Sequence, residues 1–326
     1  MYDELSNPIL VHEGPPTRAN SLLAKPRAPL VLVHDGGGTT FSYCLLDPIG
    51  RPVWGIQNAN LHRGGWWDGG ISEMAAHYIR LLAKVLPQGG DILLGGWSLG
   101  GHLSLEMAYQ IAKAARDDST SSSSSTNGGS SANGDGNGAR TPVPKFRVLG
   151  MIFIDTIFPR RLAELRGPLP TQPLLLSPEA SRAMKLKEKV DVNMTHARMM
   201  VGSWAIPRWA PSSSSAASTS SGSDNGNDDG GKEDDEEGAE PRPPAPPTIL
   251  LRAKEFVAPD SSKAFVDHVR DFRLLGWDEY NAANGGFIRE VVDVEGHHFS
   301  IFKDEHLTGV SRKISAAADK LDPPGF

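Results

Sequence analysis

The chain alternates between short apolar runs and longer stretches in which apolar residues recur at helical spacing. Residues 28–35 form a continuous apolar run, the pattern of a strand buried on both faces of a parallel sheet. Residues 71–86 instead place apolar side chains every third or fourth position, which predicts an amphipathic helix. The pattern predicts strands at 28–35, 51–58, 91–98, 146–156, 247–255 and 288–296. It predicts helices at 71–86, from 99 to about 115, from about 261, and at 311–321.

Strands that alternate with helices are typical of a mostly parallel sheet flanked by helices, so we expect an α/β fold in one domain over residues 1–326. Two tracts rich in Ser, Gly, Asn and Asp interrupt this pattern, at residues 117–142 and 211–247. They carry too little apolar surface to offset the entropy lost when a backbone becomes ordered. We expect both to be disordered insertions into surface loops, because the alternating pattern continues on either side of each.

Composition narrows the range of partners. The chain has 326 residues, of which 39% are hydrophobic and 22% charged, and its formal net charge is -6. This charge offers no basic face, so we do not expect nucleic acid as a partner. The first residues lack the pattern of a signal peptide, and no run reaches the roughly 18 apolar residues of a membrane span. The chain has a single cysteine, so it cannot form an internal disulfide. We therefore expect a cytoplasmic protein with no membrane partner.

One serine lies among glycines where a predicted strand passes into a predicted helix. The sequence Gly96-Trp97-Ser98-Leu99-Gly100 follows an apolar run and precedes helix-forming residues. In this context G-x-S-x-G is the pattern of the nucleophile elbow of α/β hydrolases, a tight turn that exposes the serine. The helix N-terminus behind the turn supplies N–H groups for an oxyanion. Ser98 is therefore the predicted nucleophile, and the alternative is an idle serine in a glycine-rich turn.

A serine nucleophile needs a base, and the base needs an orienting carboxylate. In α/β hydrolases the three residues occur in the order serine, acid, histidine. His297 and His298 follow the last predicted strand, where the base is expected, and spacing alone leaves open which of them faces the serine. Asp155 ends the buried strand beside the serine strand, whereas Asp260 or Glu255 follows the next strand. The residues alone leave the choice of acid open as well.

An oxyanion hole is the remaining requirement for this chemistry. The first predicted strand is followed by Gly36, Gly37 and Gly38, which allow backbone N–H groups to converge on one point. One donor from this loop and the N–H of Leu99 would form the hole. A glycine-rich loop can also hold phosphate, but neither G-x-G-x-x-G nor a P-loop lysine is present. We expect no nucleotide, no other cofactor and no metal.

These segments together resemble the thioesterases that release products from polyketide synthases and nonribosomal peptide synthetases. The resemblance covers residues 29–303 apart from the two polar tracts, and it rests on VHDGGGT, GWSLGGHLSLEMA and GHHF. It implies an α/β-hydrolase fold in which Asp155 is the acid and His298 is the base. It also implies that Gly36 supplies the second oxyanion N–H, beside that of Leu99.

The chain departs from the pattern of this family in three respects. His34 and Asp35 replace the usual pair of prolines in the oxyanion loop. The two polar tracts are foreign to the compact core of the family, and no carrier-protein serine motif precedes the domain. We therefore expect a free-standing enzyme rather than the final domain of a large synthase.

The resemblance further implies a helical lid over an acyl channel at residues 160–210. Met199, Met200 and Trp204 lie in this stretch, and we expect them to line the channel as substrate-binding residues, because methionine and tryptophan form adaptable apolar surfaces. The alternative is that these side chains only pack the lid helices onto the body. Residues 63–75 contain two tryptophans and are expected near the rim of the site.

The resemblance implies acyl transfer by a serine hydrolase. Ser98 would attack an acyl thioester on the phosphopantetheine arm of an acyl or peptidyl carrier protein. Water or a hydroxyl of the acyl chain would then resolve the acyl-enzyme to an acid or a lactone. Two alternatives are a general carboxylesterase or lactonase acting on small free esters, and a noncatalytic α/β-hydrolase scaffold that binds a ligand or a partner.

Overall fold

The structure, a computed structural model, describes residues 6–15, 26–123, 144–159, 170–211, 241–257 and 264–324. Its strands are β1 (Ile9–His12), β2 (Leu30–Val33), β3 (Val53–Ile56), β4 (Gly90–Trp97), β5 (Phe146–Ile154), β6 (Thr248–Ala253) and β7 (Ile288–Val294). They form one sheet in the order β1-β3-β2-β4-β5-β6-β7. β1 is antiparallel to β3, and the other neighbouring pairs are parallel. The predicted mostly parallel sheet is confirmed.

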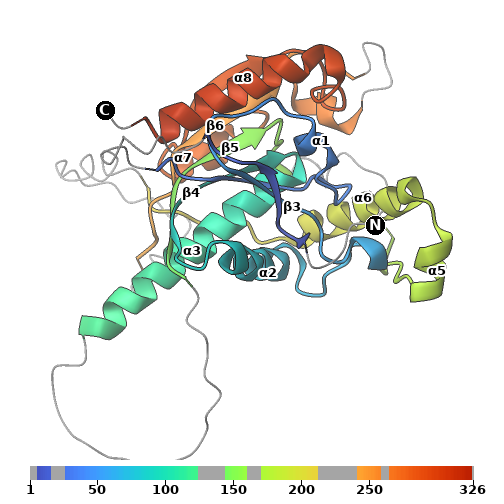
Figure 1. Cartoon of the computed structure of the whole chain (residues 1–326), viewed down its shortest axis with the longest axis horizontal. Coiled ribbons are helices and arrows are strands. Elements are labelled where there is room, and N and C mark those ends of the chain that lie inside the picture. The colour runs from blue at the N-terminus through green and yellow to red at the C-terminus, as the bar shows by residue number, and fades with distance from the viewer. Residues whose placement is uncertain are drawn as a thin grey trace, which may run out of the picture.

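Helices flank this sheet on both faces (Figure 1). They are α1 (Phe41–Cys44), α2 (Gly70–Val85), α3 (Leu99–Ser123), α5 (Pro178–Ala183), α6 (Leu186–Ser203), α7 (Asp278–Ala283) and α8 (Asp304–Leu321). Two short 3-10 helices, η2 (Leu61–Arg63) and η3 (Phe265–Val269), lie in connections. No helix in the described ranges combines the length and the apolar character needed to cross a membrane.

The strands send their side chains into two buried clusters, one on each face of the sheet. Along β2, Leu30 and Leu32 belong to one cluster and Val31 and Val33 to the other, because successive side chains of a strand point to opposite faces. Helices α2 and α3 cover the face of the valines, and α8 covers the face of the leucines (Figure 1). Burial on both faces explains why this strand is continuously apolar.

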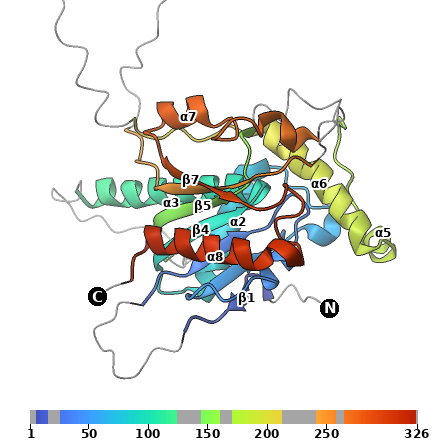
Figure 2. The same cartoon turned by 90° about the horizontal axis from the view of Figure 1, so that it is seen from above.

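The order of the strands creates a crevice at the carboxyl edge of the sheet. β3 lies on one side of β2 and β4 lies on the other. The connections that leave β2 and β4 therefore run away from each other. Ligands of open α/β sheets bind at such a reversal of strand order. The glycine-rich loop follows β2 and the predicted nucleophile follows β4, so both lie at this crevice. Helices α5 and α6 lie together at one end of the molecule, and α6 contacts α2 (Figure 2).

The structure differs from the predicted elements in the lengths of three helices, in two short helices that were not predicted (α1 and α7), and in one strand. Helix α8 begins at Asp304 rather than at residue 311. Helix α3 continues to Ser123, so residues 117–123 of the first polar tract are helical, and the prediction of disorder there is wrong. A helix that is already formed can extend through poor formers, because propagation is easier than nucleation. The helix expected from about residue 261 is the short η3. Strand β1 was not predicted, since it is a partly exposed edge strand without a continuous apolar run.

Most of the two polar tracts lies outside the described residues, namely residues 124–142 of the first and 212–240 of the second. At the end of the second tract, residues 241–247 connect to β6 without regular secondary structure. There Pro243 O accepts a hydrogen bond from Ala210 N–H at 2.9 Å. The two sides of this tract are therefore held together next to the body of the fold. Residues 160–169 of the predicted lid also lie outside the described residues.

Candidate active site

Ser98 lies at the turn between β4 and α3 and has a backbone conformation that residues with side chains rarely adopt. Its φ is 56°, in the left-handed region. Its N–H donates to Ile154 O at 2.9 Å, and its carbonyl accepts from Gly101 N–H at 3.1 Å. A strained residue that its surroundings hold in place in this way is typical of functional sites.

Two glycines of this turn are required because another backbone segment passes close to them. A Cβ atom at Gly100 would lie 2.2 Å from the carbonyl oxygen of Val33, and one at Gly96 would lie 2.5 Å from the same oxygen. Any side chain at these positions would push the turn away from β2. The glycine spacing of the motif therefore reflects how the first turn of α3 packs against β2.

Asp155 directly follows β5 and is completely buried beside the serine strand. Its φ of 46° is also left-handed, and its N–H donates to Leu251 O at 2.7 Å. Its carboxylate accepts from Ala253 N–H at 2.9 Å and from His298 Nδ1 at 2.7 Å. The structure thus brings the predicted acid and the predicted base into direct contact, although they are 143 positions apart in the chain.

A third side chain, which was not predicted from the sequence, holds the same carboxylate. Arg270 is buried directly after η3, and its Nη1 and Nη2 donate to the two oxygens of Asp155 at 2.5 and 2.7 Å. Nη1 also donates to Ala253 O at 3.1 Å. This is the two-pronged arrangement that guanidinium groups form with carboxylates. Arg270 carries no motif of its own, so only the packing of η3 against the ends of β5 and β6 reveals it.

These contacts determine the charge of Asp155. Burial by itself would raise the pKa of Asp155, but the hydrogen bonds and charges of His298 and Arg270 lower it below its ordinary value. Asp155 is therefore an anion at neutral pH, and a carboxylate only accepts hydrogen bonds. His298 Nδ1 must then carry the proton, which leaves Nε2 as the acceptor nitrogen of the neutral ring.

His298 lies on the loop between β7 and α8 and is enclosed by aromatic side chains. The ring centroids of Phe299, Trp97 and Phe265 lie 4.8, 5.6 and 6.3 Å from that of His298. These rings pack around the imidazole, which is almost completely buried. His298 nevertheless belongs to the lining of a cavity.

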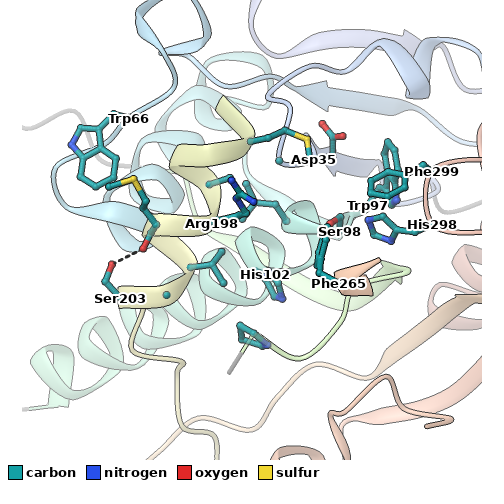
Figure 3. Close-up of a pocket in the computed structure, with 18 of the residues that line it drawn as sticks. Asp35, Trp66, Trp97, Ser98, His102, Arg198, Ser203, Phe265, His298 and Phe299 are labelled. Atoms are coloured by element: carbon teal, nitrogen blue, oxygen red, sulfur yellow. Dashed lines mark hydrogen bonds between the residues drawn. The ribbon is translucent and has the colours of Figure 1, made fainter. Parts of the chain in front are cut away.

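The cavity beside His298 has a volume of about 620 Å³, within the range of small-molecule sites. Ser98 and His298 line it (Figure 3). Leu99 and Gly36 also line it, so the predicted nucleophile, base and oxyanion donors share one space. Leu99 is the first residue of α3, and its N–H is therefore one of the free donors of the helix N-terminus. The described residues contain no group of three His, Cys, Asp or Glu side chains placed to hold a metal ion.

The rest of the cavity wall is mainly apolar, and α6 forms much of it (Figure 3). Trp66, from the segment expected near the rim, also lines the cavity. Two charged side chains reach the lining, Asp35 from the loop after β2 and Arg198 from α6. A largely apolar space with a few polar groups at the reactive end suits an acyl chain with a polar head.

Of the three predicted substrate-binding residues, Met199 lines the cavity, whereas Met200 and Trp204 are not among its described lining residues. Met200 is buried in the core beneath α6. Trp204 donates from Nε1 to Glu106 Oε2 at 2.9 Å and so belongs to the contact between α6 and α3. The prediction of a lining role is wrong for these two residues. The side chain of Met200 points into the core instead and is almost completely buried there.

The alternative candidates for the acid and the base lie elsewhere. Glu255 is exposed and accepts a hydrogen bond from the backbone of the loop that precedes the histidines. Asp260 lies outside the described residues. His297 is partly exposed, and its Nδ1 accepts a backbone N–H within its own loop. The pair that meets at the cavity is Asp155 and His298.

Sequence comparison places the chain among proteins of known class. No family model matches the chain. It is 34% identical over 322 residues to Thioesterase frbE of Dothideomycetidae sp., which covers 98% of this chain and 97% of that protein. It is 32% identical to the Probable thioesterase gloN of Glarea lozoyensis, with 97% of this chain and 98% of that protein covered.

Comparison of structures agrees with the fold that the sequence predicted. The chain is similar to the NocB thioesterase domain in covalent complex with a fluorophosphonate nocardicin G analog, with a TM-score of 0.51 and 20% identity over 90% of this chain and 95% of that chain. It is also similar to a part of a four-domain nonribosomal peptide synthetase, with a TM-score of 0.51 and 18% identity over 92% of this chain and 20% of that chain. The predicted α/β-hydrolase fold and the predicted family resemblance are confirmed. The chain belongs to the family of thioesterases that includes frbE and gloN.

Proposed function

We propose that this thioesterase cleaves an acyl thioester through an acyl-enzyme on Ser98, and that the thioester is presented on the phosphopantetheine arm of a carrier protein. The observation that carries the proposal is the hydrogen bond between His298 Nδ1 and Asp155 Oδ2 at 2.7 Å, beside a cavity that Ser98 lines in a left-handed conformation. A hydroxyl, a correctly protonated imidazole and a buried carboxylate are the parts that nucleophilic acyl transfer requires.

In the first half of the reaction, Ser98 Oγ bonds to the carbonyl carbon of the thioester while His298 Nε2 takes the hydroxyl proton. The N–H groups of Gly36 and Leu99 stabilise the resulting oxyanion. The carbon–sulfur bond then breaks, and the leaving thiolate takes the proton from His298. Asp155 stays ionised throughout and stabilises the imidazolium through Nδ1.

In the second half, His298 Nε2 takes a proton from water or from a hydroxyl of the bound acyl chain. The oxygen that lost this proton attacks the ester carbon, and Ser98 Oγ leaves with the proton from His298. Water yields the free acid and an acyl hydroxyl yields a lactone. Helices α5 and α6, which belong to the predicted lid at residues 160–210, act as the wall that holds the acyl chain, with Met199 in contact with it.

Intact-mass analysis of the protein after exposure to a panel of acyl thioesters tests this function. The native chain should gain the mass of an acyl group, whereas Ser98→Ala should gain none and lose about 10⁴- to 10⁶-fold in kcat. Ser72→Ala, at an exposed serine on α2, is the matched control and should behave as the native chain. Full thioester cleavage by Ser98→Ala would reject the proposed mechanism.

Two further measurements separate the proposal from its alternatives. Matched acyl thioesters and oxygen esters should differ in kcat/KM in favour of the thioester, and the opposite preference would indicate a carboxylesterase. A fluorophosphonate probe should label Ser98, because the probe needs a nucleophilic hydroxyl and a working base. An unlabelled serine would indicate a noncatalytic binding scaffold.

A further inference from the structure

The loop that carries the proposed oxyanion donor contains a buried histidine that is not in the proposed catalytic set. His34 precedes Asp35 and Gly36, and both of its ring nitrogens have partners. Nδ1 lies 2.5 Å from Asp35 O, and Nε2 lies 2.7 Å from the hydroxyl oxygen of Tyr78. Tyr78 is a completely buried residue of α2, and the two rings meet edge to face with centroids 5.6 Å apart. The imidazole of His34 thus connects the loop to α2.

These partners determine which nitrogen of His34 carries the proton. A carbonyl oxygen only accepts hydrogen bonds, so Nδ1 donates to Asp35 O and Nε2 accepts from the hydroxyl of Tyr78. Burial lowers the pKa of His34 to about 4, against the opposing effect of the hydrogen bond to Asp35. The ring is therefore neutral at neutral pH, with one donor and one acceptor that match its two partners.

The carbonyl that His34 holds belongs to the same peptide unit as the N–H of Gly36. In a planar trans peptide the C=O and N–H groups point in opposite directions. Asp35 O also accepts from Gly38 N–H at 3.0 Å, so two donors hold this carbonyl. With the carbonyl held, the Gly36 N–H must point to the opposite side of the peptide plane. Gly36 lines the cavity together with Ser98.

The loop requires such an anchor because of its composition. Gly36, Gly37 and Gly38 follow one another, and glycine has access to more backbone conformations than any other residue. A second contact restrains the next residue, since Gly37 N–H donates to Asp35 Oδ1 at 3.1 Å. Without the contact from His34, only the Gly38 N–H, which belongs to the glycine run itself, would still hold the carbonyl of the Asp35–Gly36 peptide.

We propose that His34, supported by Tyr78, is a positioning residue that orients the Gly36 N–H toward the oxyanion. This inference rests on the proposed function, in which Gly36 and Leu99 bind the oxyanion. The two N–H groups are held in different ways. Helix α3 holds the N–H of Leu99, whereas the peptide of Gly36 is held by the side chain of His34 together with the N–H of Gly38. His34 stabilises the transition state without touching the substrate.

Three substitutions separate the two hydrogen bonds of His34. His34→Asn keeps an amide donor near the place of Nδ1 and so keeps a partner for Asp35 O. His34→Gln puts its amide near the place of Nε2 and so loses that partner. Tyr78→Phe removes the hydroxyl that bonds to Nε2 and keeps the ring. Loss of a complete oxyanion donor costs about 10²- to 10³-fold in kcat. We expect a fall of about 10- to 100-fold in kcat for His34→Gln, with KM within about twofold of the native value. The fall should be smaller for His34→Asn and about two- to tenfold for Tyr78→Phe.

The binding of two inhibitors distinguishes orientation of the donor from general loosening of the site. An alkyl boronic acid bonds through boron to Ser98 Oγ, the serine proton passes to His298, and the tetrahedral anion occupies the oxyanion hole. A thioether in which a methylene replaces the substrate carbonyl fills the same cavity without an oxyanion. We expect His34→Gln to weaken binding of the boronic acid at least about tenfold more than binding of the thioether.

His196→Gln is the matched control for this comparison. His196 is also a buried histidine with both ring nitrogens bonded, Nδ1 to Gly64 O at 2.6 Å and Nε2 to Leu174 N–H at 2.9 Å. His196 lies on α6 and its ring meets that of Trp66, so this substitution removes the same kind of contact from the cavity wall but leaves the oxyanion loop intact. Any weakening should then affect both inhibitors alike. The ratio of the two inhibitor affinities should therefore stay at the native value.

Two results would overturn the inference. One is equal weakening of both inhibitors by His34→Gln, and the other is a kcat within twofold of native in all three variants. If His34→Gln does not fold, the inhibitor ratio of Tyr78→Phe decides in its place, because that variant loses one hydroxyl and keeps its ring. Failure of the proposed function would give a different result, because Ser98→Ala would then still cleave the thioester.

Discussion

The carboxyl edge of the sheet and the wall formed by α6 bound the same cavity but are built in different ways. At the edge, buried polar side chains bond directly to one another, as Asp155 shows by accepting from Ala253, His298 and Arg270. Along α6, the residues that face the cavity are mainly apolar, with Met194 and Met199 among them. The edge depends on directional contacts, whereas the wall depends on shape.

This difference indicates that the edge and the wall should respond differently to substitution. Hydrogen bonds and charges at the edge need the correct distance and direction, so a small displacement there removes the chemistry. An apolar wall with flexible methionine side chains adapts to different acyl chains at little cost. We therefore expect changes at the edge to affect kcat and stability together, and changes on the wall to affect the choice of substrate.

The largest effect should come from removing the guanidinium that holds Asp155. Arg270→Met leaves a buried carboxylate without its cation, and breaking a buried ion pair in this way costs about 3–5 kcal/mol in the free energy of unfolding. The pKa of Asp155 should rise, because burial still acts while one of the lowering contacts is lost. Asp155 must be ionised to hold His298 Nδ1–H, so the acid limb of the pH–rate profile should move to higher pH.

Arg273→Met is the control for this prediction, since Arg273 is an exposed arginine three positions further on. It should leave both the thermal midpoint and the pH–rate profile near the native values. In the native chain the depressed pKa of Asp155 adds stability above its unfolded pKa of 3.8, and this stability is lost as the pH falls toward the folded pKa. An Arg270→Met variant with native stability and a native acid limb would contradict the role given to this ion pair.

A smaller effect should separate two neighbouring methionines of α6. Met200→Ala removes a core side chain and should lower the free energy of unfolding by about 2–5 kcal/mol. Met199→Ala should lower it by less than about 1 kcal/mol, because that side chain faces the cavity. Competition between a short and a long acyl thioester should show a changed preference, of about two- to tenfold, for Met199→Ala alone. A changed acyl-chain preference in Met200→Ala would contradict the assignment of Met199 to the cavity wall and Met200 to the core.

The smallest effect should appear at Asp35, where the edge and the cavity meet. Burial raises the pKa of Asp35 to about 6 from its ordinary value of 3.8, and a hydrogen bond from Gly37 N–H opposes this. The ionised carboxylate is thus less favourable in the folded chain than in the unfolded chain. Folding stability is therefore lost as the pH rises from about 4 to about 6, and the penalty persists above that range.

Asp35→Asn removes this charge and keeps an oxygen for Gly37 N–H. It should raise the free energy of unfolding by roughly 1–3 kcal/mol at pH 8 and by almost nothing at pH 4. Denaturant unfolding of both chains at the two pH values measures the difference. An increment of the same size at pH 4 and pH 8 would show that the charge of Asp35 is not the cause.

Local pattern alone was sufficient for much of the fold. The parallel strands could be predicted because burial on both faces leaves a continuous apolar run, as in β2 (Leu30–Val33). The turn at Ser98 could be predicted because a tight strand-to-helix turn needs glycines on both sides. Strand β1 escaped prediction because an edge strand is only partly buried, and Met200 was assigned to the cavity because sequence does not state which way a helix faces.

The sequence by itself determined the alternation of strands and helices, the position of the elbow and the family to which the chain belongs. These depend on residues that are close together in the chain or on motifs of fixed spacing. Only the tertiary structure decided that Arg270 holds Asp155 and that Tyr78 supports His34. These contacts join segments that lie far apart in the chain, and no local pattern specifies them, because they arise from the way the sheet and its helices pack.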